Sequence, residues 1–146
     1  TRRDIADAFD NGMEFFSTFG GSTLSCVVGK KVLDVTQRDS LQQHAQVVGN
    51  KLLAGFEQLK QKYPLIGDVR GAGLFLGIEL VKDRESLEPA ASEASQISNA
   101  LKDAGILIGT DGPHHNVLKI RPPMPFDSDN ADELLTSLTQ CLEKIQ

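Results

Sequence analysis

The sequence predicts an α+β fold in which a small antiparallel sheet is covered on one face by helices. Several segments repeat apolar residues at helical spacing, and shorter runs rich in Val, Ile, Leu and Phe lie between them, with glycines at the turns. The chain has 146 residues, of which 40% are hydrophobic, so it is long enough for one domain with its own core.

Three helices are expected in the first part of the chain. A short one covers 4–9, and a second begins after Ser22, whose hydroxyl suits the N-cap position. The second helix has an apolar side and few charges in its middle, so we expect it to be well buried. A third begins at Asp39 or Ser40, repeats apolar residues at helical spacing and is terminated by Pro64.

A two-stranded β element is expected after these helices. Its strands lie within 66–70 and 73–81, and Gly71 and Gly73 are expected to form the turn between them. The glycine spacing is one residue too long for the dinucleotide-binding pattern G-x-G-x-x-G, and a strand rather than a helix follows it. The glycines therefore indicate a hairpin and not a nucleotide site.

The rest of the chain is expected to alternate helices with short strands. Pro89 is typical of a helix start, and Gly105 is typical of a helix end. In order, we expect a helix between these two residues, a strand over 106–108, a loop over 109–116, a strand with one covered face over 117–121, and a last helix capped by Asp127 or Ser128.

The charge balance argues against several classes of partner. The formal net charge is −5, whereas binding to a nucleic acid needs clustered Lys and Arg. No basic amphipathic helix is visible and the apolar runs are far shorter than a bilayer span, so no membrane contact is expected. The chain opens on charged residues rather than on a signal peptide, and we expect a cytoplasmic protein.

The cysteines and histidines do not indicate a metal site. Cys26 and Cys141 lie far apart on apolar helix faces and are expected to be reduced, packed thiols. His44 is expected to face solvent from a polar stretch of helix, and His114 and His115 lie in a loop. None has further ligands at the spacing that metal sites use, so no metal ligand is predicted.

The stretch 17–21, Ser-Thr-Phe-Gly-Gly, follows an aromatic pair and leads directly into a helix. Adjacent glycines free the backbone to adopt positive φ and leave its N–H groups uncrowded. The helix start adds unpaired N–H groups and a partial positive charge, a combination that suits an anion such as a phosphate. The alternative is an ordinary loop with Ser22 as a helix cap, and local chemistry alone favours that alternative.

Two basic residues near the end of the chain form a second candidate site. Lys119 and Arg121 lie two residues apart in an expected strand, so both side chains point to the same face. The guanidinium offers a planar fork and the ammonium a point charge, and together they are able to receive a carboxylate or a phosphate. A solvated sheet face is the alternative. Arg70, by contrast, is expected to be structural, with Asp68 or Glu79 as its partner.

Four motifs occur in the same order as in a known enzyme family. They are Thr18 to Ser22, Asp68 to Leu74, Gly77 to Leu80 and Ile120 to Pro123. Together they resemble the C-terminal part of class III aminotransferases, which are pyridoxal-phosphate enzymes of fold type I, and the resemblance covers essentially the whole chain. The stretch from Gly112 to Met124 resembles most closely the ethanolamine-phosphate phospho-lyase branch of that family.

The resemblance implies roles for individual residues. In the family, the threonine of the Thr-Phe-Gly-Gly turn contacts the phosphate of a cofactor in the partner subunit, which implies this role for Thr18, beside Phe19 and Gly20, in a homodimer. Family aminotransferases usually carry an arginine for the substrate carboxylate where this chain has Lys119. A lysine there is compatible with a phosphorylated or shorter amine, and Lys119 and Arg121 are expected to meet the anionic end of the substrate.

The family holds pyridoxal phosphate as a Schiff base on a lysine upstream of the segment that matches Thr1. Lys30 and Lys31 follow the turn within a helix and do not fit that role, so no catalytic residue is expected in this chain. The resemblance therefore implies an N-terminal arm or connector over 1–21 and a small C-terminal domain over 22–146, and it implies that the fragment is inactive alone.

Three functions are compatible with these observations. The first is transfer of an amino group from a primary amine or amino acid to a 2-oxo acid by the enzyme of which the chain is part. The second is a phospho-lyase reaction on a phosphorylated amine. The third is a non-catalytic dimerisation module, because Phe9, Phe15, Phe16 and Phe19 have few apolar partners nearby in the sequence.

Overall fold

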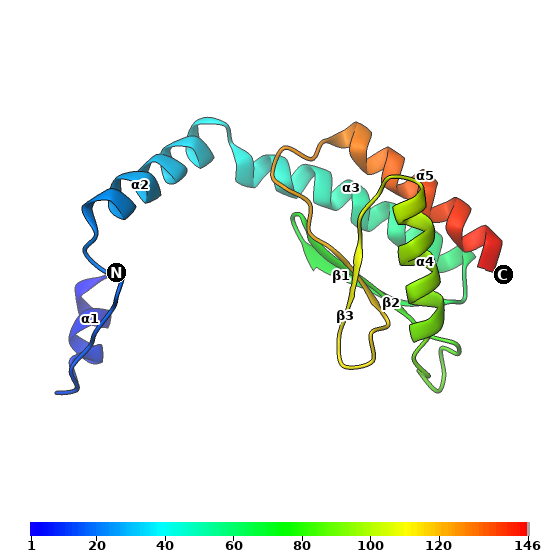
Figure 1. The fold of residues 1–146 in the computed structure, drawn as a ribbon, viewed down its shortest axis with the longest axis horizontal. Helices are drawn as coiled ribbons and strands as arrows, with labels where there is room; N and C mark the ends of the chain where they lie inside the picture. The colour runs from blue at the N-terminus through cyan, green and yellow to red at the C-terminus, as the bar shows by residue number, and fades with distance from the viewer. Residues whose placement is uncertain (146) are drawn as a thin grey trace. The chain divides into compact units, whose positions relative to one another are not determined.

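The computed structural model describes residues 1–145, which divide into two compact units. The first unit, Thr1–Asp39, holds α1 (Arg3–Phe9) and α2 (Thr23–Arg38), as labelled in Figure 1. The second unit begins at Ser40 and holds the remaining helices and all the strands. The division into an arm or connector over 1–21 and a C-terminal domain over 22–146 stays a prediction.

The helix α2 begins where the sequence predicts, because the Ser22 hydroxyl accepts a hydrogen bond from the N–H of Ser25 at 3.4 Å. The expectation that this helix is well buried is wrong, since none of its residues is buried. Its apolar stripe meets no covering element within the first unit. Cys26 lies on this helix and is exposed, so it is not the packed thiol that was expected, whereas Cys141 is buried.

The second unit is built on a four-stranded antiparallel sheet. Its strands lie in the order β1 (Ile66–Ala72), β2 (Phe75–Leu80), β4 (Val117–Ile120) and β3 (Gly109–Asp111). The predicted hairpin between β1 and β2 is confirmed, with Gly73 at a φ of 53° in its two-residue turn. The expectation that Gly71 also belongs to the turn is wrong, because Gly71 lies in β1 and pairs with Leu76.

The side chains of the sheet alternate between a buried and an open face. In β2, Leu76, Ile78 and Leu80 are buried, whereas the residues between them are partly exposed. In β4, Leu118 and Ile120 are buried in the same way, and they pair with Ile78 and Leu76. The register therefore places these two apolar pairs on the same face of the sheet, which is the face toward the helices.

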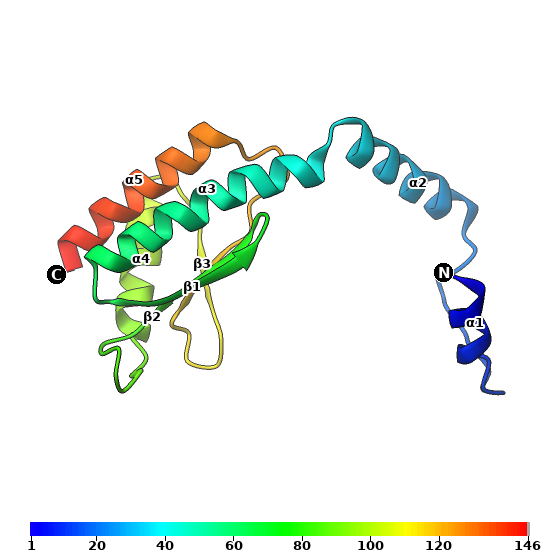
Figure 2. The ribbon, with the colours of Figure 1, turned by 180° about the vertical axis from the view of Figure 1, so that it is seen from behind.

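Three helices lie on the apolar side of the sheet. They are α3 (Leu41–Lys62), α4 (Ala91–Asp103) and α5 (Ser128–Ile145). The helices α3 and α4 pack on the strands, and α5 packs against both helices (Figure 1). The view from behind in Figure 2 shows the β1–β2 hairpin running alongside α3. The α+β class with helices on one face is thus confirmed.

The core takes side chains from every layer. Fully enclosed side chains include Leu52, Phe56, Tyr63, Ile66, Ile78, Ile97, Leu101, Leu118, Leu138 and Leu142. The helix α5 is capped by Asp127, as predicted, because its carboxylate accepts from the N–H groups of Asp129 and Asn130 at 3.0 Å.

Some predicted element limits are wrong. The third strand begins at Gly109 and not at Ile106, so part of the expected loop over 109–116 is strand. Pro89 forms an isolated β-bridge with Val81, and α4 begins two residues later. His44 does not simply face solvent, because it is partly buried and its Nε2 lies 2.9 Å from the carbonyl oxygen of Phe126.

Candidate functional site

The turn over residues 17–22 is compact, and its residues from Ser17 to Gly21 are exposed. The N–H of Gly20 donates to Oγ of Ser17 at 3.1 Å, and the N–H of Ser22 donates to the carbonyl of Phe19 at 3.4 Å. A Cβ at Gly20 would lie 3.0 Å from Cβ of Ser17, so the turn is tight at this point. Gly21 has a φ of +75°, a conformation that suits glycine.

Several donors of this turn stay available. Within residues 1–145, no hydrogen bond engages the hydroxyl of Thr18 or the N–H groups of Gly21, Thr23 and Leu24. The last two belong to the first turn of α2, where the helix dipole favours an anion. A hydroxyl and unpaired amides beside a helix start form a donor set that fits a phosphate group, and the turn is accessible to one because Thr18, Phe19 and Gly20 are exposed.

The second predicted site lies on the open face of the sheet. Lys119 stands in β4, and its direct neighbours across the two adjoining strands are Gly77 and Gly109. Because glycine has no side chain, the Lys119 side chain is not crowded from either strand. A Cβ at Gly109 would meet nothing within 4 Å, so the space beside Lys119 is open on this side.

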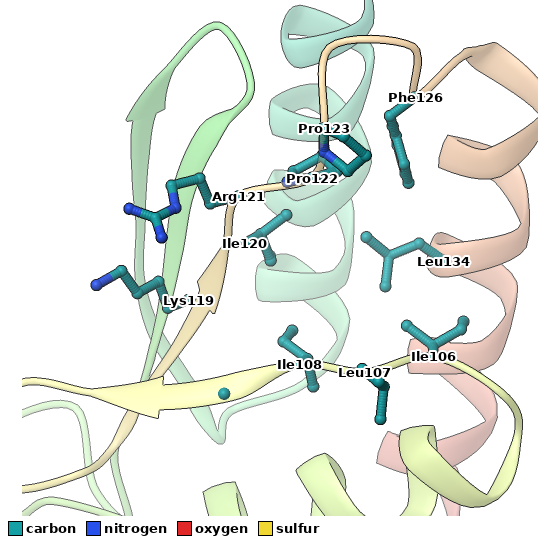
Figure 3. A pocket seen from close by; sticks show the side chains of 11 residues that line it. Ile106, Leu107, Ile108, Lys119, Ile120, Arg121, Pro122, Pro123, Phe126 and Leu134 are labelled. Atoms are coloured by element: carbon teal, nitrogen blue, oxygen red, sulfur yellow. The ribbon is translucent and has the colours of Figure 1, made fainter.

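Two hollows meet at Lys119. One hollow has a volume of about 500 Å³ and is open to solvent. Its lining residues are Ile106 to Gly109 on one side and Lys119 to Pro123, Phe126 and Leu134 on the other. Figure 3 shows its apolar side chains gathered on one side, while the Lys119 and Arg121 side chains both point to the other. The prediction that these two cations share a face is confirmed.

The second hollow has about 580 Å³ and lies over the β1–β2 hairpin and the start of the 112–116 loop. Arg70, Phe75, Asp111 and Lys119 contribute side chains to its lining. Lys119 therefore forms a ridge between the two hollows, because it lines both.

The two cations differ in their partners. The ammonium of Lys119 donates to Oδ2 of Asp111, and Oδ1 of Asp111 accepts from the N–H of Gly112 at 2.8 Å. Lys119 and this N–H hold the pKa of the Asp111 carboxyl below its ordinary range. Arg121 forms no ion pair with any carboxylate of residues 1–145. The site thus presents one compensated and one uncompensated cation.

Arg70 has the structural role that the sequence predicts. Its Nη1 donates to Asp68 at 2.7 Å and to Glu79 at 2.6 Å, so both expected partners are present at once. Arg70 lowers the pKa of Asp68, and the two carboxylates raise the pKa of the guanidinium. These bonds tie β1 to β2 on the open face of the sheet.

Sequence reasoning missed Asp111 as a member of this site. The stretch around it was assigned to a loop, whereas the structure places it in β3, on the strand next to Lys119. An antiparallel hairpin closed around 112–116 would have indicated this proximity, because it sets Asp111 opposite Val117 and diagonal to Lys119.

The remaining candidates add no further chemistry. Lys30, in the exposed α2, pairs with Asp34 at 3.3 Å. In the part of the chain from 1 to 145, no three His, Cys, Asp or Glu side chains are grouped so as to hold a metal ion. None of the helices described there has the length and apolar character that a membrane crossing requires.

The sequence and the fold correspond to one enzyme family. A family model described as Aminotransferase class-III matches residues 1–142. The chain belongs to the class III aminotransferase family, as the four ordered motifs predict. This is a family of pyridoxal-phosphate-dependent aminotransferases and lyases.

Two relatives illustrate the range of this family. An alanine–glyoxylate aminotransferase 2-like protein from Drosophila melanogaster is 44% identical over 147 residues, which cover 99% of this chain and 30% of the relative. Ethanolamine-phosphate phospho-lyase homolog 1 from Caenorhabditis elegans is 43% identical over 143 residues, which cover 97% of this chain and 31% of the relative. The chain spans about 30% of the length of these curated relatives.

Solved structures show the same fold. A phospholyase from Arthrobacter, in complex with phosphoethanolamine, matches with a TM-score of 0.86 at 34% identity, over 98% of this chain and 34% of that one. An amine transaminase from an uncultivated Pseudomonas species, in a PLP-bound form, matches with a TM-score of 0.82 at 29% identity, over 98% of this chain and 34% of that one.

Proposed function

We propose that the chain is the C-terminal part of a pyridoxal-phosphate enzyme that transfers an amino group from a primary amine or amino acid to a 2-oxo acid. The observation that carries this proposal is the exposed turn at Thr18, with its free hydroxyl and amide donors, in a chain of this family. Its proposed partners are a small-molecule amine and a 2-oxo acid. A cytoplasmic location stays a prediction.

The turn is proposed to hold the cofactor phosphate of a partner subunit in a homodimer. When bound, pyridoxal phosphate would supply an electron sink for the reaction of the substrate amine. This chain would bind and orient the cofactor: the Thr18 hydroxyl and the Gly21 N–H would hold its phosphate, and Phe19 and Gly20 shape the turn. Hydrogen bonds to a charged acceptor of this kind are among the stronger ones in proteins.

Lys119 in β4 and Arg121, which directly follows that strand, are proposed to receive the anionic end of the substrate. Lys119 and Arg121 point to the same side of the sheet and border an open hollow, which supports this role. Binding the far end of the substrate positions its amine for reaction, and such positioning accounts for a large share of catalytic rate.

The lysine that carries the cofactor is proposed to lie outside these 146 residues. The chain alone is then inactive, and treatment with pyridoxal phosphate and borohydride should give no stoichiometric label at a defined lysine. A single residue labelled to one equivalent would overturn this part of the proposal. Scattered, substoichiometric labelling of exposed lysines is the expected background.

A phospho-lyase reaction is the second candidate. It is favoured by the match to the Arthrobacter phospholyase, at a TM-score of 0.86, and by lysine rather than arginine at position 119. The enzyme that contains this chain should be given phosphoethanolamine, and both free phosphate and amine transfer to pyruvate or 2-oxoglutarate should be measured. Phosphate release without amine transfer would select the lyase, and the reverse would select the aminotransferase.

The substitution Thr18→Ala tests the cofactor role directly. We expect weaker retention of pyridoxal phosphate by the holoenzyme, by roughly ten-fold or more, because one hydrogen bond to a charged group contributes about 1.5–3 kcal/mol. The thermal midpoint of the cofactor-free protein should not change, since Thr18 is exposed. Thr36→Ala is a matched control, because Thr36 lies in α2 and bonds only to the carbonyl of Val32. Unchanged cofactor affinity in Thr18→Ala would count against the phosphate role.

A further inference from the structure

The ammonium of Lys119 is already bound within the chain. It donates to Asp111, and the carboxylate of Asp111 is itself fixed from the other side by the N–H of Gly112 at 2.8 Å. Gly112 has a φ of +83°, so the backbone at this point takes a conformation that glycine adopts readily. An anion that approaches Lys119 therefore meets an ion pair and not a free cation.

The formal charges of the open site can be counted. Among the charges next to Lys119, Asp111 contributes one negative charge, and Lys119 and Arg121 contribute one positive charge each, so this group of three leaves one positive unit. Arg70, which lines the adjoining hollow, is paired with Asp68 and Glu79, and these three residues add one negative unit to the same face. A carboxylate, with one negative charge, matches the surplus of the first group, and the second group gives no support for a second negative charge on the ligand. A phosphate monoester carries close to two negative charges near neutral pH, because its second pKa is about 6.

We propose that Asp111 determines the charge selectivity of this anion site, by disfavouring dianionic groups at Lys119 relative to monoanionic ones. The proposal rests on the proposed role of Lys119 and Arg121 as receivers of the substrate anion. Asp111 is a specificity-determining residue in this account and does not contact reacting atoms.

The magnitude follows from Coulomb's law. The repulsion between Asp111 and a bound anion is proportional to the charge of that anion, so the effect on a dianion is the square of the effect on a monoanion. At a separation of about 6 Å in water, removal of the Asp111 charge should raise affinity roughly three-fold for a monoanion and roughly ten-fold for a dianion.

The substitution Asp111→Asn tests this with small probes. The isotope-labelled 146-residue chain is titrated with acetate and with methyl phosphate at pH 7.5 and constant low ionic strength, because salt screens exposed charges. Amide chemical shifts of Gly109, Lys119 and Arg121 report binding. Asparagine keeps an oxygen that accepts from Gly112, so the turn should be retained, and Asp111→Glu keeps the charge and should keep the wild-type selectivity.

A matched control separates local charge from net charge. Asp132 pairs with Lys51 at 2.6 Å between α5 and α3, so Asp132→Asn makes the same change in net charge away from the site. We expect the ratio of methyl phosphate to acetate affinity to rise roughly three-fold in Asp111→Asn and to stay unchanged in Asp132→Asn. An equal ratio in the two variants, or lower affinity for both anions in Asp111→Asn, would overturn the proposal.

One outcome would identify a failure at an earlier step. If neither anion shifts the amides of Lys119 and Arg121 in any variant, the anion-binding role of these residues in the proposed function is refuted, and the selectivity role of Asp111 fails with it. Binding with unchanged selectivity, in contrast, overturns only the role of Asp111.

Discussion

The helix α3 approaches the backbone of the β1–β2 hairpin closely at Gly49. A Cβ placed on this residue would lie 2.0 Å from the carbonyl oxygen of Gly73 and 2.5 Å from its carbonyl carbon, in the turn of the β1–β2 hairpin. Real Cβ atoms do not approach other atoms this closely, and both groups at the contact are backbone. The substitution Gly49→Ala therefore requires α3 and the hairpin to move apart by more than 1 Å.

The expected cost has two opposing parts. Alanine is the better helix former, which stabilises the substituted helix by about 1 kcal/mol. Overpacking of a well-packed interior costs about 1–3 kcal/mol, and more where rigid groups collide. Since the obstacle is backbone and Gly49 is buried, we take the upper end of that range. The difference between the two parts is the expected effect, so Gly49→Ala should lower the free energy of unfolding by about 2 kcal/mol.

Gly55, in the same helix, is the matched control. A Cβ there would lie 2.6 Å from the two Cδ atoms of Leu135, which are the far end of a flexible side chain. That side chain is able to rotate away, so Gly55→Ala should change stability by about 1 kcal/mol or less. Ala54→Gly, at an exposed position of α3, calibrates the helix-propensity contribution in this chain.

The assay is urea unfolding of the 146-residue chain followed by far-ultraviolet circular dichroism, with the transition midpoints compared at constant slope. If Gly49→Ala is as stable as the wild type, or is destabilised no more than Gly55→Ala, the close contact between α3 and the hairpin is not a feature of the folded protein. Hydrogen exchange at the β1–β2 turn would show where the displacement is accommodated.

Two further predictions concern charged side chains. Arg84 donates to the carbonyls of Tyr63 at 2.9 Å and Ile66 at 3.1 Å. Arg84→Met should lower the free energy of unfolding by about 1–3 kcal/mol in urea titrations, and Arg84→Lys should recover only part of it, because an ammonium lacks the planar fork. Arg70 lowers the pKa of Asp68 in the folded protein. The ionised carboxylate therefore stabilises the fold at pH values above the ordinary pKa of about 3.9, and this stabilisation is lost as the pH falls through the lowered pKa. In Asp68→Asn, the stability difference from wild type should be present at pH 7 and vanish at the acid end of a pH series.

Much of the fold was predictable because its signals are periodic. The alternation in β2 and β4 predicts which face of the sheet is buried, and it places Lys119 and Arg121 together on the other face. The long apolar repeat of α3 and its end at Pro64 are equally clear. The exposure of α2 was not predictable in this way. An apolar stripe indicates a helix face that packs against another element, but it does not show whether that element belongs to the same unit.

The member of the site that was missed shows where periodicity stops helping. The strand β3 has only three residues and begins with glycine, so it offers too few side chains for an alternating pattern. Its identity depends on pairing with β4 across the turn at 112–116, which is a property of the backbone and not of a side-chain pattern. Yet this pairing brings Asp111 to Lys119 and changes the charge that a substrate would meet. Lys119 and Arg121 are therefore insufficient to assign a substrate: a lysine at 119 taken alone is compatible with a phosphate, whereas the ion pair that it forms is proposed to favour an anion with a single charge.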